Sequence, residues 1–182
     1  MIPVAAALVE AGADGLCVAT LDEAVALRDA GVGGRLTVLY PVPPSLARLA
    51  AERSVAVAAG DADRMRELLA AAGSGGASGV DATLDVELEV ETGLGRGGAA
   101  VSEVVAVAGA ISSADGARLA GVWTHLQATE DRERTTAQIA RFEEALAALR
   151  SAGIDIPRRH VAARPPGRPS PATTRRAAGR RS

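Results

Sequence analysis

Short apolar segments alternate with helix-like segments along the first 163 residues of the chain. The apolar segments predict six strands, at 16–18, 36–39, 55–58, 83–90, 119–124 and within 154–163. The segments with helical periodicity predict helices of 8 to 18 residues, at 2–11, 22–30, 45–52, 61–72, 102–111 and 135–152. Ser102 is the expected N-cap of the fifth helix, and the expected apolar stripe of the last helix consists of Ile139, Phe142, Leu146 and Leu149. The glycine-rich residues 73–76 are expected to be a flexible link. Parallel strands need a crossover between them, and a helix usually supplies it. The alternation therefore predicts an α/β protein with a parallel sheet.

Two architectures satisfy this alternation. A closed (β/α)8 barrel needs eight strand–helix units and about 250 residues, whereas an open doubly wound sheet is complete with about six strands. The chain has 182 residues and offers about six strands. No G-x-G-x-x-G follows the first predicted strand, so the nucleotide-binding form of the open sheet has no support. A partial barrel and an open sheet remain as alternatives at this point.

The segment 83–98 carries the most specific pattern in the chain. Apolar residues at 86, 88 and 90 alternate with glutamates at 87, 89 and 91, which predicts a strand with one apolar and one acidic face. The next seven residues contain four glycines, and Arg96 is their only charged side chain. A guanidinium on a glycine-rich turn at the end of a strand is well placed to bind an oxygen anion. The alternative is a surface turn with a solvated arginine.

The string E-T-G-L-G-R-G-G at 91–98 resembles the D-T-G-[ML]-G-R-x-G motif of bacterial alanine racemases, which are pyridoxal phosphate (PLP) enzymes of fold-type III. Four more segments resemble motifs of that family in the same order, at 9–24, 121–126 (G-V-W-T-H-L), 138–142 (Q-I-A-R-F) and 160–163 (H-V-A-A). The resemblance implies that 1–163 form a PLP-binding domain. Its fold would be a partial (β/α)8 TIM barrel without the family's first and last strands.

The resemblance also implies a reaction and a site. The family interconverts L-alanine and D-alanine for cell-wall precursor supply, as a homodimer. By resemblance, Arg96 contacts the phenolic oxygen of PLP and His125 lies against the pyridine ring. Glu89 stands where many members have a carbamylated lysine, and a direct pair with Arg96 would hold the guanidinium in place. Thr92 is expected to cap the turn. The alternatives are a structural role for His125 at the strand end and a solvent-facing Glu89. For His160, which also follows a strand signal, a structural role is expected.

One residue type is absent. All 20 basic residues are arginines, so the sequence contains no lysine. PLP enzymes hold the cofactor as a Schiff base on a lysine amine, and arginine stays protonated and cannot replace it. The family's second base is a tyrosine of a C-terminal domain, which has no counterpart in these residues. We therefore expect no catalytic residue and no racemase activity from this chain alone. A PLP-binding homeostasis-type barrel and a non-catalytic remnant are the alternative functions.

The charge is divided unevenly along the chain. Eight arginines and no acid lie between Pro157 and Ser182, so the first 156 residues carry a net charge of −10. Residues 164–182 are rich in Arg, Pro and Ala, contain no aliphatic side chain larger than alanine, and are expected to be a disordered tail. A shifted reading frame of GC-rich DNA is one hypothesis for this tail. Nucleic-acid binding is a weaker one, because no aromatic residues interleave with the arginines.

The remaining composition bears on location. Cys17 is the only cysteine, which excludes an internal disulfide, and we expect it to be an inert core thiol in an apolar strand. There is no apolar run of about 18 residues and no leader-like start. The sequence therefore predicts a cytoplasmic protein with no membrane partner.

Overall fold

The computed structural model describes residues 1–73 and 82–163. Its six strands form a single parallel sheet in the order β1-β2-β3-β4-β5-β6. The strands are β1 (Gly15–Val18), β2 (Arg35–Val38), β3 (Val55–Ala59), β4 (Leu84–Glu89), β5 (Ala117–Leu126) and β6 (Arg159–Ala163). The expected basic tail at 164–182 and most of the predicted flexible link at 73–76 lie outside the described residues.

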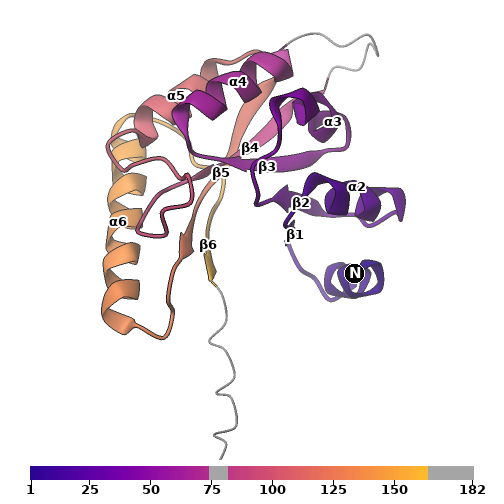
Figure 1. The fold of residues 1–182 in the computed structure, drawn as a ribbon, viewed down its shortest axis with the longest axis horizontal. Helices are drawn as coiled ribbons and strands as arrows, with labels where there is room; N and C mark the ends of the chain where they lie inside the picture. The colour runs from indigo at the N-terminus through magenta and orange to yellow at the C-terminus, as the bar shows by residue number, and fades with distance from the viewer. Residues whose placement is uncertain (74–81, 164–182) are drawn as a thin grey trace, which may run out of the picture.

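The helices alternate with the strands and lie on the outside of the curled sheet (Figure 1). They are α1 (Ile2–Glu10), α2 (Leu21–Asp29), the 3-10 turn η1 (Pro44–Leu46), α3 (Ala47–Glu52), α4 (Ala62–Gly73), α5 (Val104–Ser113) and α6 (Arg132–Ser151). A doubly wound sheet would carry helices on both faces. The one-sided, curled arrangement is that of a partial TIM barrel, as predicted.

The core fills the space between the outer face of the sheet and the helices. The apolar residues of β4, Leu84, Val86 and Leu88, are fully buried there, together with Ile111 of α5 and Leu146 of α6. Burying a side chain of this kind contributes about 1.5–3 kcal/mol. Alanine, valine and leucine dominate the core cluster, as expected for a chain with 2% aromatic residues.

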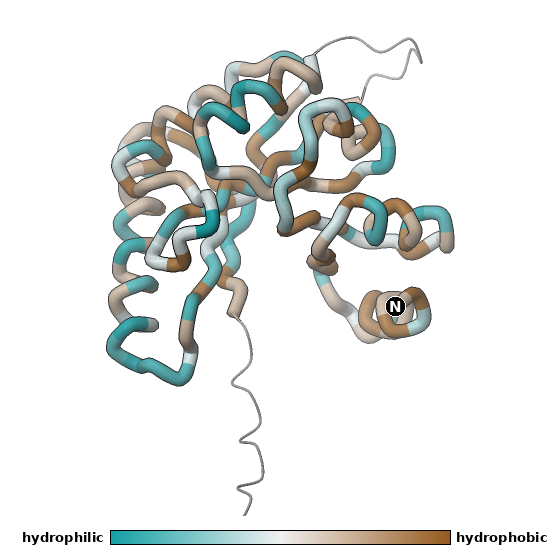
Figure 2. The backbone as a smooth tube through the Cα atoms, in the orientation of Figure 1, coloured by the Kyte–Doolittle hydropathy of each residue, from teal (hydrophilic) through white to brown (hydrophobic). Residues whose placement is uncertain are grey.

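Polar residues gather in the connections between the elements. Figure 2 shows the connection from β5 to α6 as a mostly hydrophilic segment. Helix α6, which follows this connection, begins three residues earlier than predicted. Asp131 caps it by accepting a hydrogen bond from the backbone N–H of Arg134. No helix among the described residues is long and apolar enough to cross a membrane.

Two local predictions are wrong. Ser102 is not the N-cap of α5, which begins after Glu103 without a side-chain cap. The cap with a full hydrogen-bond pair is instead at α2, where Thr20 and Glu23 form a capping box. Cys17 is exposed and is not a core thiol. The reason is that β1 is an edge strand of the sheet, with a neighbouring strand, β2, on one side.

Candidate functional site

The acidic face of β4 points into the hollow of the curled sheet. Glu87 and Glu89 are 0% and 8% exposed, so the predicted alternation is confirmed and the solvent-facing alternative for Glu89 is excluded. Nη2 of Arg96 lies 3.0 Å from Oε1 of Glu89, as the sequence predicted for this pair. Burial raises the pKa of Glu89, and the Arg96 guanidinium opposes that rise.

The turn that carries Arg96 is organised by Glu91. The Glu91 carboxylate accepts hydrogen bonds from the backbone N–H groups of Gly93, Gly95 and Arg96. Gly95 has φ +75, a conformation that glycine adopts without strain. The prediction that Thr92 caps this turn is therefore wrong, since a carboxylate has two oxygens and reaches several N–H groups at once.

Thr92 instead points into the protein and is 1% exposed. Its hydroxyl lies 2.7 Å from that of Thr124 on β5 and accepts a hydrogen bond from Nε2 of Gln138 on α6, at 3.2 Å. Arg141, one turn further along α6, donates to the Thr92 carbonyl oxygen at 2.6 Å. The glycine turn is thus hydrogen-bonded to both β5 and α6.

His125 lies near the end of β5, and the structure brings it close to Arg96 through Trp123. The Trp123 and His125 rings meet edge to face with centroids 6.2 Å apart, and Cζ of Arg96 lies 5.7 Å from the Trp123 ring centroid. Burial, followed by the charge of Arg96, lowers the pKa of His125. The imidazole is therefore neutral at pH 7.

The residues at the carboxyl ends of β4 and β5 are compatible with PLP. Two buried nitrogens there, Nε of Arg96 and Nδ1 of His125, have no hydrogen-bond partner among the described residues, and a buried polar atom normally has one. A fixed guanidinium matches the phenolic oxygen of PLP, and a neutral imidazole matches its ring. These two contacts fit the cofactor that the resemblance implies.

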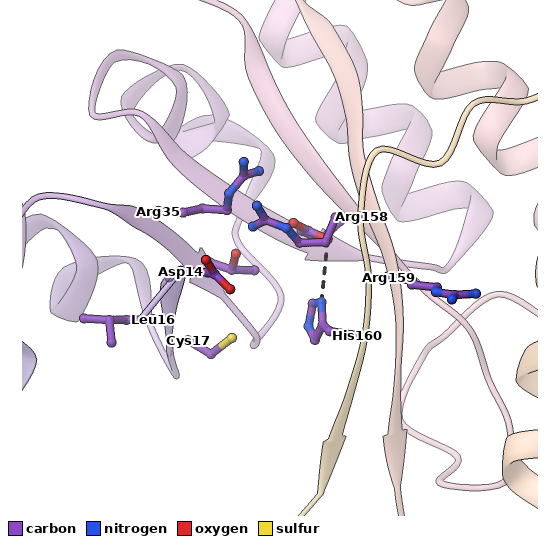
Figure 3. A pocket seen from close by; sticks show the side chains of 10 residues that line it. Asp14, Leu16, Cys17, Arg35, Arg158, Arg159 and His160 are labelled. Carbon is purple, nitrogen blue, oxygen red and sulfur yellow. Dashed lines mark ion pairs between the residues drawn. The ribbon is translucent and has the colours of Figure 1, made fainter. Parts of the chain in front are cut away.

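A second polar group lies deeper in the hollow, around Glu87. Both of its carboxylate oxygens are buried without a hydrogen-bond partner among the described residues, and Nδ1 of His160 is 4.0 Å from Oε2. Burial raises the pKa of Glu87, while Arg158 and Arg35 oppose that rise. A cavity of about 360 Å³ adjoins it, with Asp14 and Cys17 on one wall and Arg158 and His160 on the other (Figure 3).

His160, for which the sequence favours a structural role, packs against Trp123. Its ring stacks on Trp123 with centroids 5.4 Å apart and an interplanar angle of 10°. Burial and the charge of Arg158 lower its pKa. His125 and His160 therefore approach the same indole, the first by its edge and the second by its face.

Sequence reasoning missed four residues of these groups: Glu87, Glu91, Gln138 and Arg141. The sequence could have indicated Gln138 and Arg141, because both belong to the Q-I-A-R-F segment and residues three apart share one face of a helix. Glu91 and Glu87 belong to the acidic alternation, but the pattern cannot tell which glutamate turns back to the backbone and which is sealed inside.

Known proteins place this geometry in a family. The family model described as "Alanine racemase, N-terminal domain" matches residues 1–165. The alanine racemase of Limosilactobacillus fermentum is 36% identical over 152 residues, which cover 82% of this chain and 40% of that protein. The alanine racemase of Beutenbergia cavernae is 40% identical over 169 residues, with 89% and 43% covered. The chain thus spans about two fifths of the length of the curated relatives it matches.

Solved structures agree with these relatives. The alanine racemase from Bacillus anthracis, solved with bound L-Ala-P, superposes with a TM-score of 0.76 at 33% identity and covers 88% of this chain and 41% of that one. The histidine racemase from Leuconostoc mesenteroides has a TM-score of 0.76 at 30% identity, with 88% and 42% covered. By sequence and by fold, the chain belongs to the alanine racemase N-terminal domain family.

Proposed function

We propose that this chain is the cofactor-binding part of a PLP-dependent amino-acid racemase, in which Arg96 and His125 contact PLP and alanine is the substrate. The observation that carries the proposal is the Arg96–Glu89 pair, at 3.0 Å, with Nε of Arg96 left unpartnered beside it. The pair lies where β4 ends, and the carboxyl ends of barrel strands are where active sites of this fold lie.

The chain's own residues prepare this place for an anionic, aromatic ligand. Glu89 holds the guanidinium and leaves part of its donor set free, so Arg96 can stabilise an oxygen anion without reorganising. His125 presents an imidazole that burial keeps neutral, so it adds no second positive charge beside the ring. When bound, PLP withdraws electrons from the α-carbon of an amino acid and makes its proton removable.

The relatives support the proposed substrate. The curated alanine racemases named above favour alanine and favour a racemase over a homeostasis-type barrel. The histidine racemase among the similar structures shows that other amino acids are worth assaying. The proposal includes the homodimer and the cytoplasmic location that the resemblance implies, and light scattering after size-exclusion chromatography tests the first.

The proposal also includes the absence of racemase activity in this chain alone. Without a lysine in the 182 residues, no lysine side chain can form the covalent link to PLP. Mixing the purified chain with PLP and borohydride should attach the cofactor at most to the N-terminal amine. A mass increase on an internal peptide would contradict this part of the proposal.

Binding of PLP can be followed through Trp123, the only tryptophan in the chain. We expect PLP to quench its fluorescence saturably, because the indole lies 5.7 Å from Cζ of Arg96. Arg96→Leu should weaken the apparent affinity at least tenfold, since a charge-assisted contact is worth about 1.5–3 kcal/mol. Arg118→Leu is the matched control, because Arg118 pairs with Asp85 at the opposite end of the strands. Equal quenching in all three proteins would overturn the proposal.

A further inference from the structure

A chain of buried hydrogen bonds links the glycine turn, the end of β5 and helix α6. The side chains of Thr92, Thr124 and Gln138 are at most 1% exposed. Oγ1 of Thr124 donates to the Val90 carbonyl oxygen at 2.9 Å and lies 2.7 Å from Oγ1 of Thr92. Oε1 of Gln138 accepts the backbone N–H of Gln127 at 3.0 Å, while its Nε2 donates to Thr92 at 3.2 Å.

The direction of every bond in this chain is determined. A hydroxyl has one proton, and the Thr124 proton goes to the Val90 carbonyl, so Thr92 must donate to Thr124. Thr92 then accepts, and Nε2 of Gln138 is the donor that reaches it. The amide of Gln138 cannot be flipped, because its oxygen is needed for the N–H of Gln127. A directional, water-excluded chain of this kind favours one arrangement of the segments it joins.

Gln138 touches both halves of the candidate site from helix α6. Through Thr92 it holds the turn that carries Arg96. Through Gln127, and through a 3.5 Å contact from Nε2 to the His125 carbonyl oxygen, it holds the strand end that carries His125. The turn also packs directly on α6, since a Cβ built on Gly93 would lie 3.6 Å from Cγ of Gln138.

We propose that Gln138 is a positioning residue that sets the glycine turn bearing Arg96 against the strand end bearing His125. The inference deepens the proposed function and rests on it for its relevance to cofactor binding. Gln138 does not reach the ligand in this arrangement. It acts by joining two backbone segments through helix α6, in addition to the direct hydrogen bond between Thr92 and Thr124.

The two histidines of the chain provide the test, because His125 lies at the site and His160 serves as an internal reference. Their pKa values are measured by NMR titration of the protein without PLP, in wild type and in Gln138→Met, which keeps the length of the side chain but removes its hydrogen bonds. We expect the pKa of His125 to rise, since Arg96 moves away and water enters, while the pKa of His160 stays constant. The amide of Gln127 should exchange its hydrogen about tenfold faster.

Leu146→Ala controls for a weakened helix. Leu146 is fully buried two turns further along α6, so this variant should melt earlier and leave the pKa of His125 unchanged. An unchanged His125 pKa in folded Gln138→Met, with faster exchange at Gln127, would overturn the proposal. The effect of Gln138 would then be confined to the connection between β5 and α6.

Thr92→Val covers the case in which Gln138→Met does not fold, because it breaks the same link from the side of the turn. It should raise the pKa of His125 in the same way, and an unchanged value would also overturn the proposal. Because the titration needs no PLP, a wild-type chain that fails to bind PLP would refute the proposed function and leave the result on Gln138 intact.

Discussion

Gly121 and Glu87 are complementary in shape: a Cβ built on Gly121 would lie 2.2 Å from Oε2 of Glu87. The two residues face each other across β4 and β5, where they are paired in register. The carboxylate therefore occupies the space that any other residue at 121 would need.

Gly121→Ala should destabilise the protein by about 1–3 kcal/mol, the usual cost of overpacking a dense site. The Arg158 carbonyl oxygen is also 3.1 Å from the same Cβ position, so a methyl group there would stay crowded by backbone even if the carboxylate moved. Gly109→Ala is the matched control, because nothing lies within 4 Å of its Cβ position in α5. This control should gain about 0.5–1 kcal/mol. Urea unfolding measures both, and equal effects at the two positions would contradict the steric argument.

Glu87→Gln should change how stability depends on pH. Burial raises the pKa of Glu87 above 4.5, so the folded state binds this proton more tightly than the unfolded state does. Stability from this group is therefore complete below about pH 4.5 and is lost as the pH rises through the folded pKa. The amide does not ionise, so Glu87→Gln should be more stable than wild type at pH 8 and lose that advantage toward pH 4. Thermal melts from pH 4 to 8 test this, and parallel curves for the two proteins would refute it.

Glu91→Ala should loosen the glycine turn. Three backbone N–H groups lose a charged acceptor, and we expect a loss of about 1–3 kcal/mol. Glu91→Gln keeps the length and one acceptor oxygen, so it should retain part of that stability. Hydrogen exchange at Gly95 locates the effect. Wild-type exchange there in Glu91→Ala would show that the turn is held by its contacts with α6 alone.

Thr20→Ala should cost about 1 kcal/mol, because it removes the capping box of α2. Ser102→Ala is its counterpart and should leave stability within about 0.5 kcal/mol, since Ser102 caps no helix. Chemical unfolding of the pair compares a cap that the structure contains with one that the sequence only suggested. A larger loss for Ser102→Ala than for Thr20→Ala would reverse this assignment.

The helices and strands were predictable because hydrophobic periodicity and helix-ending glycines are properties of short stretches of sequence. Predicted and observed strands differ by a few residues at most, and the Arg96–Glu89 pair was expected from the resemblance to the racemase motif. The contacts of α6 were harder, because the expected apolar stripe included Ile139, whereas the buried residue is Gln138. A polar side chain is placed inward only when distant partners such as Thr92 satisfy it, and those partners come from another part of the chain.

The burial of Glu87 escaped prediction for the same reason. Alternation places Glu87 and Glu89 on one face, yet Glu89 meets Arg96 whereas Glu87 meets Gly121 and His160. The exposure of Cys17 depended on β1 being an edge strand, which is a property of the assembled sheet. The local sequence pattern therefore predicts on which face of a strand a side chain lies. Which residues contact that side chain depends on the topology of the whole sheet.

The strand order has a consequence for folding. Each of the six described strands pairs with its neighbours in sequence, so these contacts between strands close loops no longer than one helix and its connections. Each strand–helix unit behaves like one repeat of a stacked array, with stability shared across the interfaces on either side. Such an array can grow unit by unit from its centre at β4, and its outer units can open while the interior stays folded.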